Sequence, residues 1–389
     1  MLYTYLKEFY DPREKKRAIE RLEDLRIQLD GAIPGKTADK TLLLATWNIR
    51  QFTNNRQKES YLYIAEILSR FDLIAIQEVK EDMKGLQEVM RILGKNWAFI
   101  ATDVSSEEDG GNHERIAFLY DTNKVSFKNV AGEIVLPHTE LIQGMQFART
   151  PFCVSFQAGW FKFNLATVHI VYGNSDEDLN RREAEISAIG RFLDARAKSE
   201  KASYIILGDF NIPKVGDRFM NALEGSGFTI PEEIKNHPTN FGSEVRHYDQ
   251  IAFDLQLEDD IQVYDEHFAS GAFDFTESVY RDKDYEEYIP YMKKDVYVPN
   301  PDKPGKRKKI QVERLGEEAL SYFHKTYRIT QMSDHMPLWL ELQVDFSNQY
   351  IDKQKKRNLD KLAELEAKEK AEAEAKAKAE AEAAAKAEA

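Results

Sequence analysis

The sequence predicts a mixed α/β (α+β) protein in which two packed sheets are flanked by helices, and two patterns support this. From Lys40 to about Val344, short apolar runs alternate with polar, helix-like segments. Several of these runs, such as LIAIQ and YIILG, are apolar at successive positions, which is typical of strands covered on both faces. An open, doubly wound sheet is the alternative arrangement for the same elements.

Residues 1–39 are predicted to form a helical lead-in to the main domain. Asp11 is suited to the N-cap and Pro12 to the first helical position. An apolar stripe then recurs at helical spacing before Gly31, at Ala18, Leu22, Leu25 and Leu29. We expect this stripe to pack on the main domain, and a dimerising helix is the alternative.

The main domain is predicted to span residues 40–349. The segments between its strands have helical periodicity, as in Glu59–Arg70 and Ser175–Arg196, and Ser175 with Asp178 offers a cap for the second helix. The predicted strands are Leu42–Trp47, Leu73–Gln77, Ile116–Tyr120, Cys153–Phe156, Phe163–His169, Tyr204–Gly208, Gln250–Phe253 and Leu338–Leu342.

Two regions differ in composition from this run of strands. Residues 255–330 are rich in Tyr, Asp and Lys and are predicted to be an elaborated insertion. Their basic loop, Asp302–Lys309, is either a basic patch on an acidic protein or a solvated turn. Residues 350–389 alternate Ala with Glu and Lys, which favours a solvated helix or a disordered spacer, and a contact for a protein partner is a further possibility.

Composition and termini indicate a cytoplasmic protein without a membrane segment. No stretch approaches the roughly 20 apolar residues that a membrane span needs. The start, MLYTYLKEFYDPREKK, is unlike a secretory signal because it contains early acidic residues and no apolar core. A single cysteine, Cys153, excludes an intramolecular disulfide and fits a reducing compartment. The net charge of −13 argues against tight non-specific nucleic-acid binding, but a local basic patch and a bound metal can offset it.

Polar side chains gather where the predicted strands begin or end. A scaffold gains little stability from charged and amide groups at so many strand ends, whereas a pocket there gains function. The motifs are TWNIRQF (Asn48, Arg50), AIQEVKE (Glu78), HERIAFLY (Glu114, Arg115), TVHIVYG (His169), LGDFNIP (Asp209, Asn211), RHYDQIAF (Asp249) and SDHMPLW (Asp334, His335).

Each of these motifs is weak evidence on its own. Glu78 after an apolar run is commonly the polar end of a strand. The GDFN sequence is more specific, because Gly permits a tight turn and Asp209 and Asn211 can face one side, although an Asx-turn is the simpler explanation. Asp334 and His335 fit a capping Asp beside a surface His. Their ordered occurrence along the chain is what indicates one shared site.

In order, WNIRQF, QEVKE, ERIAFLYD, RTPF, VHIVYG, GDFNIP, YDQIAF and SDHMPLW resemble the successive motifs of the endonuclease/exonuclease/phosphatase superfamily. The resemblance is greatest to its deoxyribonuclease I-like branch, through WNIR, the Glu-Arg before FLY, Arg149 ahead of a proline, and a GAFDF segment. It implies a four-layer αββα sandwich with the site at one edge of the paired sheets. It also implies a metal-dependent hydrolase of phosphate esters.

The resemblance implies a role for each matching residue. Glu78 resembles a metal carboxylate, and Asn48 and Asp334 would complete or support a site for Mg²⁺, or for Mn²⁺ in its place, because hard ions prefer oxygen ligands. Asp209 would orient or deprotonate the attacking water, and Asn211 would donate to a phosphate oxygen.

Two histidine–carboxylate pairs and three arginines are implied in the same way. His335 with Asp249, and His169 with Glu114, would stabilise charge on the phosphate, and which histidine protonates the leaving oxygen stays open, as does the number of metals. Backbone phosphates would be contacted by Arg50, Arg115 and Arg149.

The predicted function is Mg²⁺-dependent hydrolysis of DNA phosphodiesters with little sequence preference, with DNA as the partner. A phosphoesterase acting on RNA, a nucleotide, or an inositol or lipid phosphate is the first alternative; the pairing of Glu114 with His169 favours the nuclease. A catalytically silent interaction module is the second alternative, and it is disfavoured because every expected catalytic position is filled. Clustered carboxylates repel one another and a phosphodiester unless a cation offsets them, so we expect activity to be lost in EDTA.

Overall fold

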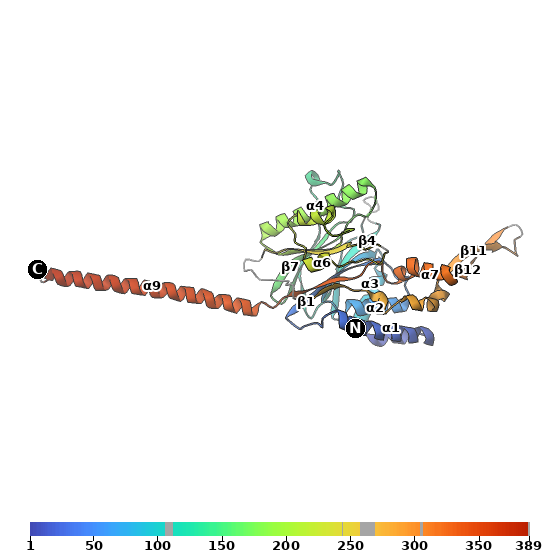
Figure 1. Ribbon diagram of the computed structural model, residues 1–389, viewed down its shortest axis with the longest axis horizontal. Coiled ribbons are helices and arrows are strands. Elements are labelled where there is room, and N and C mark those ends of the chain that lie inside the picture. The colour runs from blue at the N-terminus through green and yellow to red at the C-terminus, as the bar shows by residue number, and fades with distance from the viewer. Residues whose placement is uncertain (106–111, 243, 257–268, 304–305, 388–389) are drawn as a thin grey trace. The chain divides into compact units, whose positions relative to one another are not determined.

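Two stacked sheets with helices on their outer faces make up the first 344 residues of the chain (Figure 1). The computed structural model describes residues 1–105, 112–242, 244–256, 269–303 and 306–387. Contacts divide the chain into two units, Met1–Val344 and Asp345–Ala389. The predicted mixed α/β fold with two packed sheets is confirmed, and the open doubly wound sheet is wrong.

The first sheet has six strands in the order β10–β13–β1–β2–β4–β3. Only β1 and β2 run parallel to each other, and the remaining neighbours are antiparallel. The central strands are buried at almost every position, as expected for strands covered on both faces. The strand bounds are β1 Thr41–Phe52, β2 Leu73–Lys80, β3 Trp97–Ala101, β4 Glu114–Asp121, β10 Ser270–Ala272 and β13 Leu338–Gln343.

The second sheet has five strands in the order β5–β6–β7–β8–β9, with β7 and β8 parallel. It packs face to face on the first sheet: the ring of Phe118 on β4 stacks on Phe152 and meets Phe156 edge-on, both on β6. The strand bounds are β5 Val125–Glu133, β6 Phe152–Ala158, β7 Phe161–His169, β8 Tyr204–Asp209 and β9 Asp249–Asp254.

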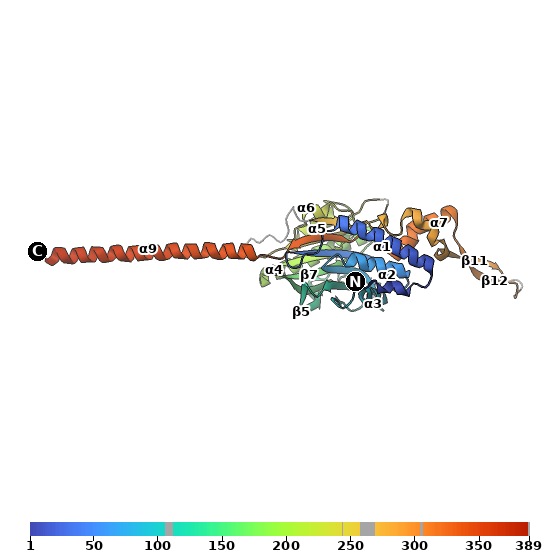
Figure 2. The same ribbon diagram turned by 90° about the horizontal axis from the view of Figure 1, so that it is seen from below.

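Helices cover both outer faces and complete a four-layer arrangement. Figures 1 and 2 show α1, α2 and α3 beside the six-stranded sheet and α4 over the five-stranded sheet. The helix bounds are α1 Pro12–Ala32, α2 Lys58–Leu68, α3 Lys84–Leu93, α4 Asp176–Glu200, α5 Arg218–Glu224 and α6 Glu232–Lys235, with short 3₁₀ turns at Tyr3–Glu8 and His138–Glu140.

The N-terminal helix α1 begins as predicted. The side chain of Asp11 accepts a hydrogen bond from the backbone N–H of Arg13 at 2.7 Å, and Pro12 is the first helical residue. The predicted stripe of Ala18, Leu22, Leu25 and Leu29 is buried in the core of the first unit. A buried ion pair between Arg17 and Glu59, at 3.0 Å, joins α1 to α2.

The segment Ser270–Gln331 builds an extension around buried tyrosines. The rings of Tyr280 and Tyr288 stack with centroids 4.8 Å apart, and the guanidinium of Arg17 lies 4.5 Å from the centre of the Tyr288 ring. Residues 257–268 and 304–305 of the predicted insertion lie outside the described residues. After β10 the segment contains η3 Phe275–Glu277, η4 Asp282–Tyr291, a hairpin of β11 Lys293–Pro299 and β12 Arg307–Glu313, α7 Gly316–Tyr322, the π-helical turn η5 Phe323–Tyr327 and α8 Arg328–Gln331.

The second unit is a single helix, α9, from Ser347 to Ala387. Its residues from Asn348 onward are nearly all exposed, so its helicity comes from the high propensity of Ala, Glu and Lys. The predicted charged helical tail is therefore confirmed as a helix. None of the helices in the described parts of the chain is both long enough and apolar enough to cross a membrane.

All eight predicted strands are present, but five described strands were not predicted: β3, β5, β10, β11 and β12. Strand β5 is an edge strand that is exposed at every residue from Lys128 to Glu133, so its apolar pattern is weak. Strand β10 has only three residues. Strands β11 and β12 alternate charged and apolar residues away from the core, and their polar composition suggested a loop.

Candidate active site

Three of the predicted site residues lie side by side across the five-stranded sheet. His169 is the partner of Asp209 in the β7–β8 pair, and Asp209 is the partner of Asp249 in the β8–β9 pair. Directly paired residues project from the same face of a sheet, so the three side chains converge. All three are buried.

Gly208 lets strand β8 approach strand β7 next to these residues. Its φ is +135°, and a Cβ at this position would lie 2.2 Å from the backbone oxygen of Val168. The glycine of the GDFN motif is therefore required by close backbone packing, and it places Asp209 at the end of β8.

The six-stranded sheet contributes Asn48 from β1 and Glu78 from β2. The pairing register of β2 shifts on both sides around Glu78, whose φ is +59°. An irregularity of this kind breaks the alternation of a strand and re-aims a side chain. Gln77 points between the sheets and donates to the hydroxyl of Thr167 at 2.9 Å, whereas Glu78 turns towards Asn48, whose Nδ2 donates to Glu78 Oε1 at 3.0 Å.

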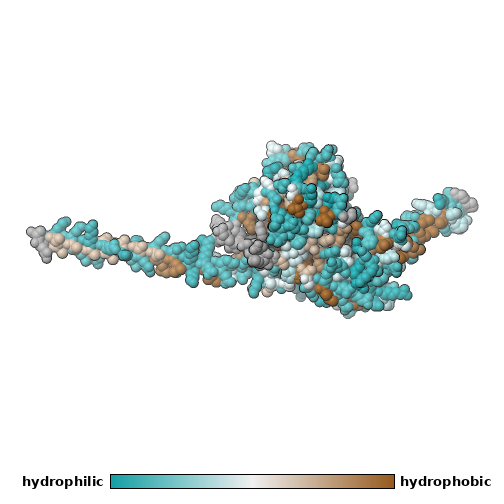
Figure 3. Space-filling model, in the orientation of Figure 1, coloured by the Kyte–Doolittle hydropathy of each residue, from teal (hydrophilic) through white to brown (hydrophobic). Residues whose placement is uncertain are grey.

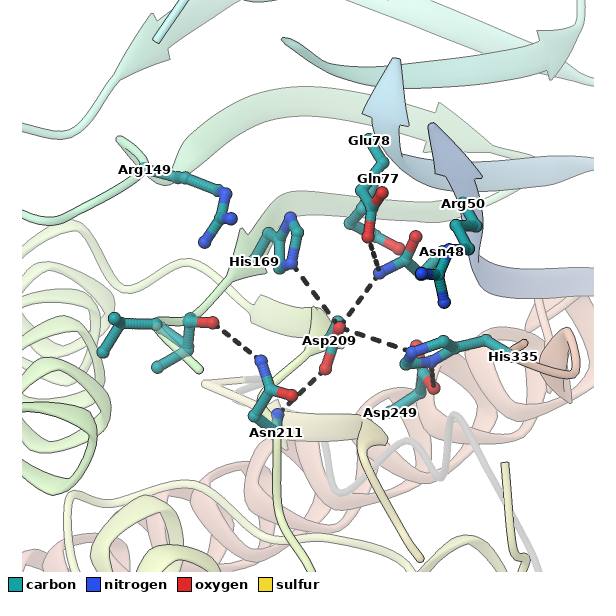
Figure 4. A network of polar contacts seen from close by, with 12 residues as sticks. Asn48, Arg50, Gln77, Glu78, Arg149, His169, Asp209, Asn211, Asp249 and His335 are labelled. Carbon is teal, nitrogen blue, oxygen red and sulfur yellow. Dashed lines mark hydrogen bonds and ion pairs between the residues drawn. The ribbon is translucent and has the colours of Figure 1, made fainter. Parts of the chain in front are cut away.

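The carboxylate of Asp209 is the centre of the site (Figure 4). Its Oδ2 accepts a hydrogen bond from Asn48 Nδ2 at 3.0 Å, and its Oδ1 accepts one from the backbone N–H of Asn211 at 2.9 Å. The Nε2 atoms of His169 and His335 lie 3.6 Å and 3.8 Å from Oδ2. These last two distances exceed a hydrogen bond, so neither Nε2 is committed to Asp209.

His335 forms a buried pair with Asp249. Its Nδ1 lies 2.8 Å from Asp249 Oδ2, and the backbone N–H of Asp249 donates to the hydroxyl of Thr239 at 3.1 Å. Burial by itself would lower the pKa of His335, but the charges of Asp249 and Asp209 outweigh it and raise the pKa to about 10. His335 is therefore a cation at neutral pH.

Glu114 forms the second pair, with His169, and also contacts two cationic side chains. Its carboxylate lies 3.4 Å from His169 Nδ1, and it accepts hydrogen bonds from Arg149 Nε at 2.9 Å and Lys80 Nζ at 3.1 Å. Burial would raise the pKa of Glu114, but His169, Arg149 and Lys80 outweigh it and lower the pKa to about 2. Glu114 is therefore ionised and orients His169 at any working pH.

The oxygen atoms beside Glu78 suit a hard divalent cation. Glu78 is only partly buried, and its Oε2 accepts the backbone N–H of Gln51 at 2.8 Å. The Oδ1 atom of Asn48 is buried and has no hydrogen-bond partner among the described residues. A carboxylate together with an unpartnered amide oxygen is the donor set that Mg²⁺ and Mn²⁺ prefer.

Asp209, Asp249 and His335 form a second group whose ligand atoms lie within 4.8 Å of one another. A protonated imidazole has no lone pair for a metal, and His335 is held as the cation by its two carboxylates. Its own positive charge already offsets Asp249 and Asp209. The contact between His335 Nδ1 and Asp249 Oδ2 makes this group a charged hydrogen-bonding network, and binding of a metal to His335 would require the imidazole to lose a proton.

Asp334 and Arg50 face each other at the edge of the site. Arg50 Nη1 donates to Asp334 Oδ2, and both side chains are partly exposed. Ser333 connects this pair to β1, because its hydroxyl accepts the backbone N–H of Arg50 and donates to the backbone oxygen of Asn48 at 2.6 Å. The hydrogen bond from Ser333 to the backbone of Asn48 thus holds Asp334 near Asn48, and the carboxylate of Asp334 accepts a hydrogen bond from Arg50.

Arg115 and Asn211 are also engaged with backbone oxygens. Arg115 donates to Thr102 O at 2.7 Å, and as the neighbour of Glu114 on β4 it projects from the opposite face of the strand. Asn211 has a φ of +54°, and its Nδ2 donates to Ile170 O at 2.8 Å. The structure brings Asn211 to Asp209 but gives Arg115 no contact with the other predicted site residues.

Lys80 and Tyr248 are two of the residues at the site that were not predicted. Lys80 lies directly opposite Glu114 in the β2–β4 pair, and only the pairing register reveals that contact. The ring of Tyr248 lies 5.6 Å from that of His335, and its signal in the sequence was its position just before Asp249.

Similar proteins were found among both sequences and solved structures. A deoxyribonuclease of Thioalkalivibrio sp. (strain K90mix) is 34% identical over 180 residues, which cover 44% of this chain and 46% of that protein. Deoxyribonuclease-1 of Bos taurus is 27% identical over 185 residues, which cover 44% of this chain and 61% of that protein. The matched part thus spans about half to three fifths of the length of these relatives.

Two solved structures are matched at low sequence identity. One is the mannosyl-6-phosphatase Bt3783 of Bacteroides thetaiotaomicron VPI-5482, with 14% identity, a TM-score of 0.47, and coverage of 77% of this chain and 99% of that one. The other is D. rerio TDP2 complexed with a single-strand DNA product, with 13% identity, a TM-score of 0.47, and coverage of 78% and 99%.

A profile of the Endonuclease/Exonuclease/phosphatase family matches residues 45–280. That match spans more than half of the chain and includes every strand that carries the site except β13. The protein therefore belongs to the Endonuclease/Exonuclease/phosphatase family.

Proposed function

We propose that this protein is a divalent-metal-dependent phosphodiesterase that cuts DNA as an endonuclease with little sequence preference. The observation that carries the proposal is the position of Asp209 between two imidazoles, each held by a second carboxylate. A buried group of this kind at strand ends suits hydrolysis of a charged ester better than it suits a scaffold.

Mg²⁺ is the proposed cofactor, with Mn²⁺ as a substitute. Glu78 would bind the ion directly, Asn48 would add its amide oxygen, and Asp334 would support the site from its place beside Arg50. When bound, the ion would supply positive charge that offsets both the clustered carboxylates and the substrate phosphate.

Asp209 would act on the attacking water. Hydrogen bonds from Asn48 and from the backbone of Asn211 fix the orientation of its carboxylate. A carboxylate held in this way can accept or direct a proton from water within hydrogen-bond reach. The water would then be positioned for attack on the phosphorus without a rearrangement of the Asp209 side chain.

The two histidines would stabilise the negative charge that develops on the phosphate. His335 keeps its proton at neutral pH, and Asp249 fixes its ring so that Nε2 is free to donate. His169, held by Glu114, is the matching donor on the other side of Asp209 (Figure 4). One of the two would protonate the leaving oxygen.

Cationic side chains around the site would bind substrate phosphates. Arg50, Arg115 and Arg149 are the proposed contacts, with Lys80 added from the structure, because guanidinium and ammonium groups match phosphate oxygens. Asn211 would donate from the second hydrogen of its amide. DNA is the proposed substrate because the relatives described above are named deoxyribonucleases.

Residues 40–349 are proposed to be the catalytic domain, with 1–39 as its leading segment, 255–330 as an insertion and 350–389 as a tail. A cytoplasmic location is proposed from the sequence alone.

The test is an assay of purified protein on supercoiled plasmid with Mg²⁺, Mn²⁺ or EDTA. Nicking is expected with either metal and is expected to disappear in EDTA. Glu78→Gln and His169→Ala are each expected to lower turnover by about 10²-fold or more. His324→Ala, which changes a partly exposed histidine of η5, is the matched control and should cut as the unchanged protein does.

The same assay on RNA, single-stranded DNA and a phosphomonoester distinguishes the substrate classes. DNA is expected to be cut fastest. Faster cleavage of another substrate would replace DNA in the proposal, and full activity in EDTA, or nicking that survives both site variants, would contradict the site itself.

A further inference from the structure

The hairpin β11–β12 concentrates positive charge in an acidic protein. Residues 293–313 contain seven Lys or Arg and three Asp or Glu, a net charge of +4 in a chain whose net charge is −13. Figures 1 and 2 show the hairpin projecting beyond α7, away from the two packed sheets. Its two strands form a sheet of their own.

The register of the hairpin separates its side chains into two faces. Tyr297 is paired with Lys309, and Val296 with Ile310, so the two pairs project on opposite sides. The first face is polar and contains an exposed tyrosine. The second face is largely apolar and only half-buried, and its apolar members are Val296, Val298, Ile310 and Val312.

Much of the hairpin's charge is not used within the described chain. Lys309 is paired with Asp295 at 2.7 Å, whereas Lys306 and Lys308 form no ion pair with any residue that the structure describes. A two-stranded hairpin is marginally stable in water on its own. A projecting ribbon with unpaired cations and a partly exposed apolar face (Figure 3) therefore indicates a surface for an anionic partner.

The base of the hairpin is connected to the candidate active site by a short stretch of the chain. After β12, the chain passes through α7, η5 and α8 directly to Asp334 and His335. Arg56 is buried and donates to the backbone oxygens of Thr330 and Met332 and to that of Arg50. The segment between the hairpin and His335 is thus held against the end of β1.

The length of the hairpin suits a duplex that extends beyond the bond being cut. A seven-residue strand is roughly 23 Å long, which corresponds to about seven steps of roughly 3.4 Å along DNA. Its cations would therefore reach phosphates several base pairs away from the reacting one.

We propose that the β11–β12 hairpin is a DNA-binding arm that lies along a groove of duplex DNA next to the site of cleavage. A two-stranded ribbon fits the major groove of B-DNA. Lys306, Arg307 and Lys308 would contact phosphates, and the valines would contact sugars and thymine methyl groups. The inference rests on the proposed DNA cleavage and names the part of the substrate that the insertion recognises.

The test replaces Lys306, Arg307 and Lys308 with Gln together and measures binding to a DNA duplex of about 30 base pairs as salt rises from about 50 to about 200 mM. Both proteins carry His169→Ala, so that the duplex is not cut. Three phosphate contacts contribute a slope of about 2.7 in log K against log salt. The affinity of the protein with an intact arm is therefore expected to fall about 40-fold more over this range than that of the variant.

A matched control neutralises the same residue types elsewhere, with Lys355, Lys356 and Arg357 of α9 replaced by Gln. This control is expected to keep the full salt dependence. With His169 restored, the arm variant should also hydrolyse bis(4-nitrophenyl) phosphate at the normal rate, because this ester is too small to reach the arm. That result also shows that the variant is folded.

The outcomes distinguish a failure of the proposed DNA-binding arm from a failure of the proposed nuclease activity. Three results would overturn the arm: an unchanged salt slope in the arm variant, an equal loss of salt dependence in the α9 control, or an equal loss on single-stranded DNA. Plasmid nicking by the unchanged protein would still support the proposed function in each case. Absence of nicking by the unchanged protein would overturn the proposed function, and the arm with it.

Discussion

At the scale of single residues, the site is organised by which groups keep their charge. Glu114 is held ionised by its contacts with His169, Arg149 and Lys80, and His335 is held protonated by Asp249 and Asp209. Nδ1 of His335 is hydrogen-bonded to Asp249, Nδ1 of His169 lies 3.4 Å from Glu114, and Nε2 of each ring is directed towards Asp209. Such fixed donors need little reorganisation when charge develops on a phosphate.

Asp249→Asn is expected to lower turnover by about 10²–10³-fold and to move the alkaline limb of the pH–kcat profile to lower pH. The raised pKa of His335 depends on the negative charge of Asp249, so its loss lowers that pKa and the imidazole loses its proton earlier as pH rises. The measurement is kcat for plasmid nicking between about pH 6 and pH 10.

Asp254→Asn serves as the control, because Asp254 is also buried on β9 but lies at the other end of the strand. It should leave the profile unchanged. An alkaline limb at the same pH in Asp249→Asn and in the unchanged protein would contradict the role given to the His335–Asp249 pair.

At the scale of elements, helix α4 supports the loops that carry the site. Arg182 donates to the backbone oxygens of Val171, Gly173 and Asn211, which follow β7 and β8. The helix begins about two turns before Arg182. Its start is a capping box, in which Ser175 and Asp178 satisfy each other's backbone N–H groups. Through Arg182, the first turns of α4 therefore hold the backbone of Asn211 in place.

Ser175→Ala is expected to destabilise the protein by about 1 kcal/mol, because the first turn of α4 loses a side-chain acceptor for a backbone N–H. The free energy of unfolding in urea measures the effect. Ser199→Ala, in the exposed last turn of the same helix, should change stability by less than about 0.5 kcal/mol. Equal effects from the two substitutions would show that the capping box contributes nothing.

At the scale of the whole molecule, the stability of the protein resides in the first unit. Apart from Phe346, the buried apolar residues lie within Met1–Val344, whereas α9 exposes nearly all of its side chains from Asn348 onward. From Asp352 onward the chain has ten acidic and ten basic residues, so the net charge of −13 belongs to the part before it.

A chain that ends at residue 349 is therefore expected to keep its melting temperature within about 2 °C, because no core is lost. Differential scanning calorimetry measures the shift, and plasmid nicking measures function. A fall of more than about 5 °C would mean that the tail packs on the catalytic unit and contributes more than about 1 kcal/mol.

The fold was predictable where burial leaves a mark on the sequence. The strands from Leu42 and from Tyr204 are apolar along their length, and the helix from Ser175 has a capping pair, so all were located within a few residues. Strand β5 was not, because an exposed edge strand pairs through its backbone, and backbone pairing places no demand on side chains.

The sequence alone determined the types of chemistry present: carboxylates, imidazoles and amides at strand ends, in an order shared with a known superfamily. The tertiary structure decided their partners. The contact of Lys80 with Glu114 follows from strand register, and the turn of Glu78 towards Asn48 follows from a local irregularity in β2. Such contacts join residues far apart in the chain, so their geometry depends on how the sheets pair and stack, which local sequence does not encode.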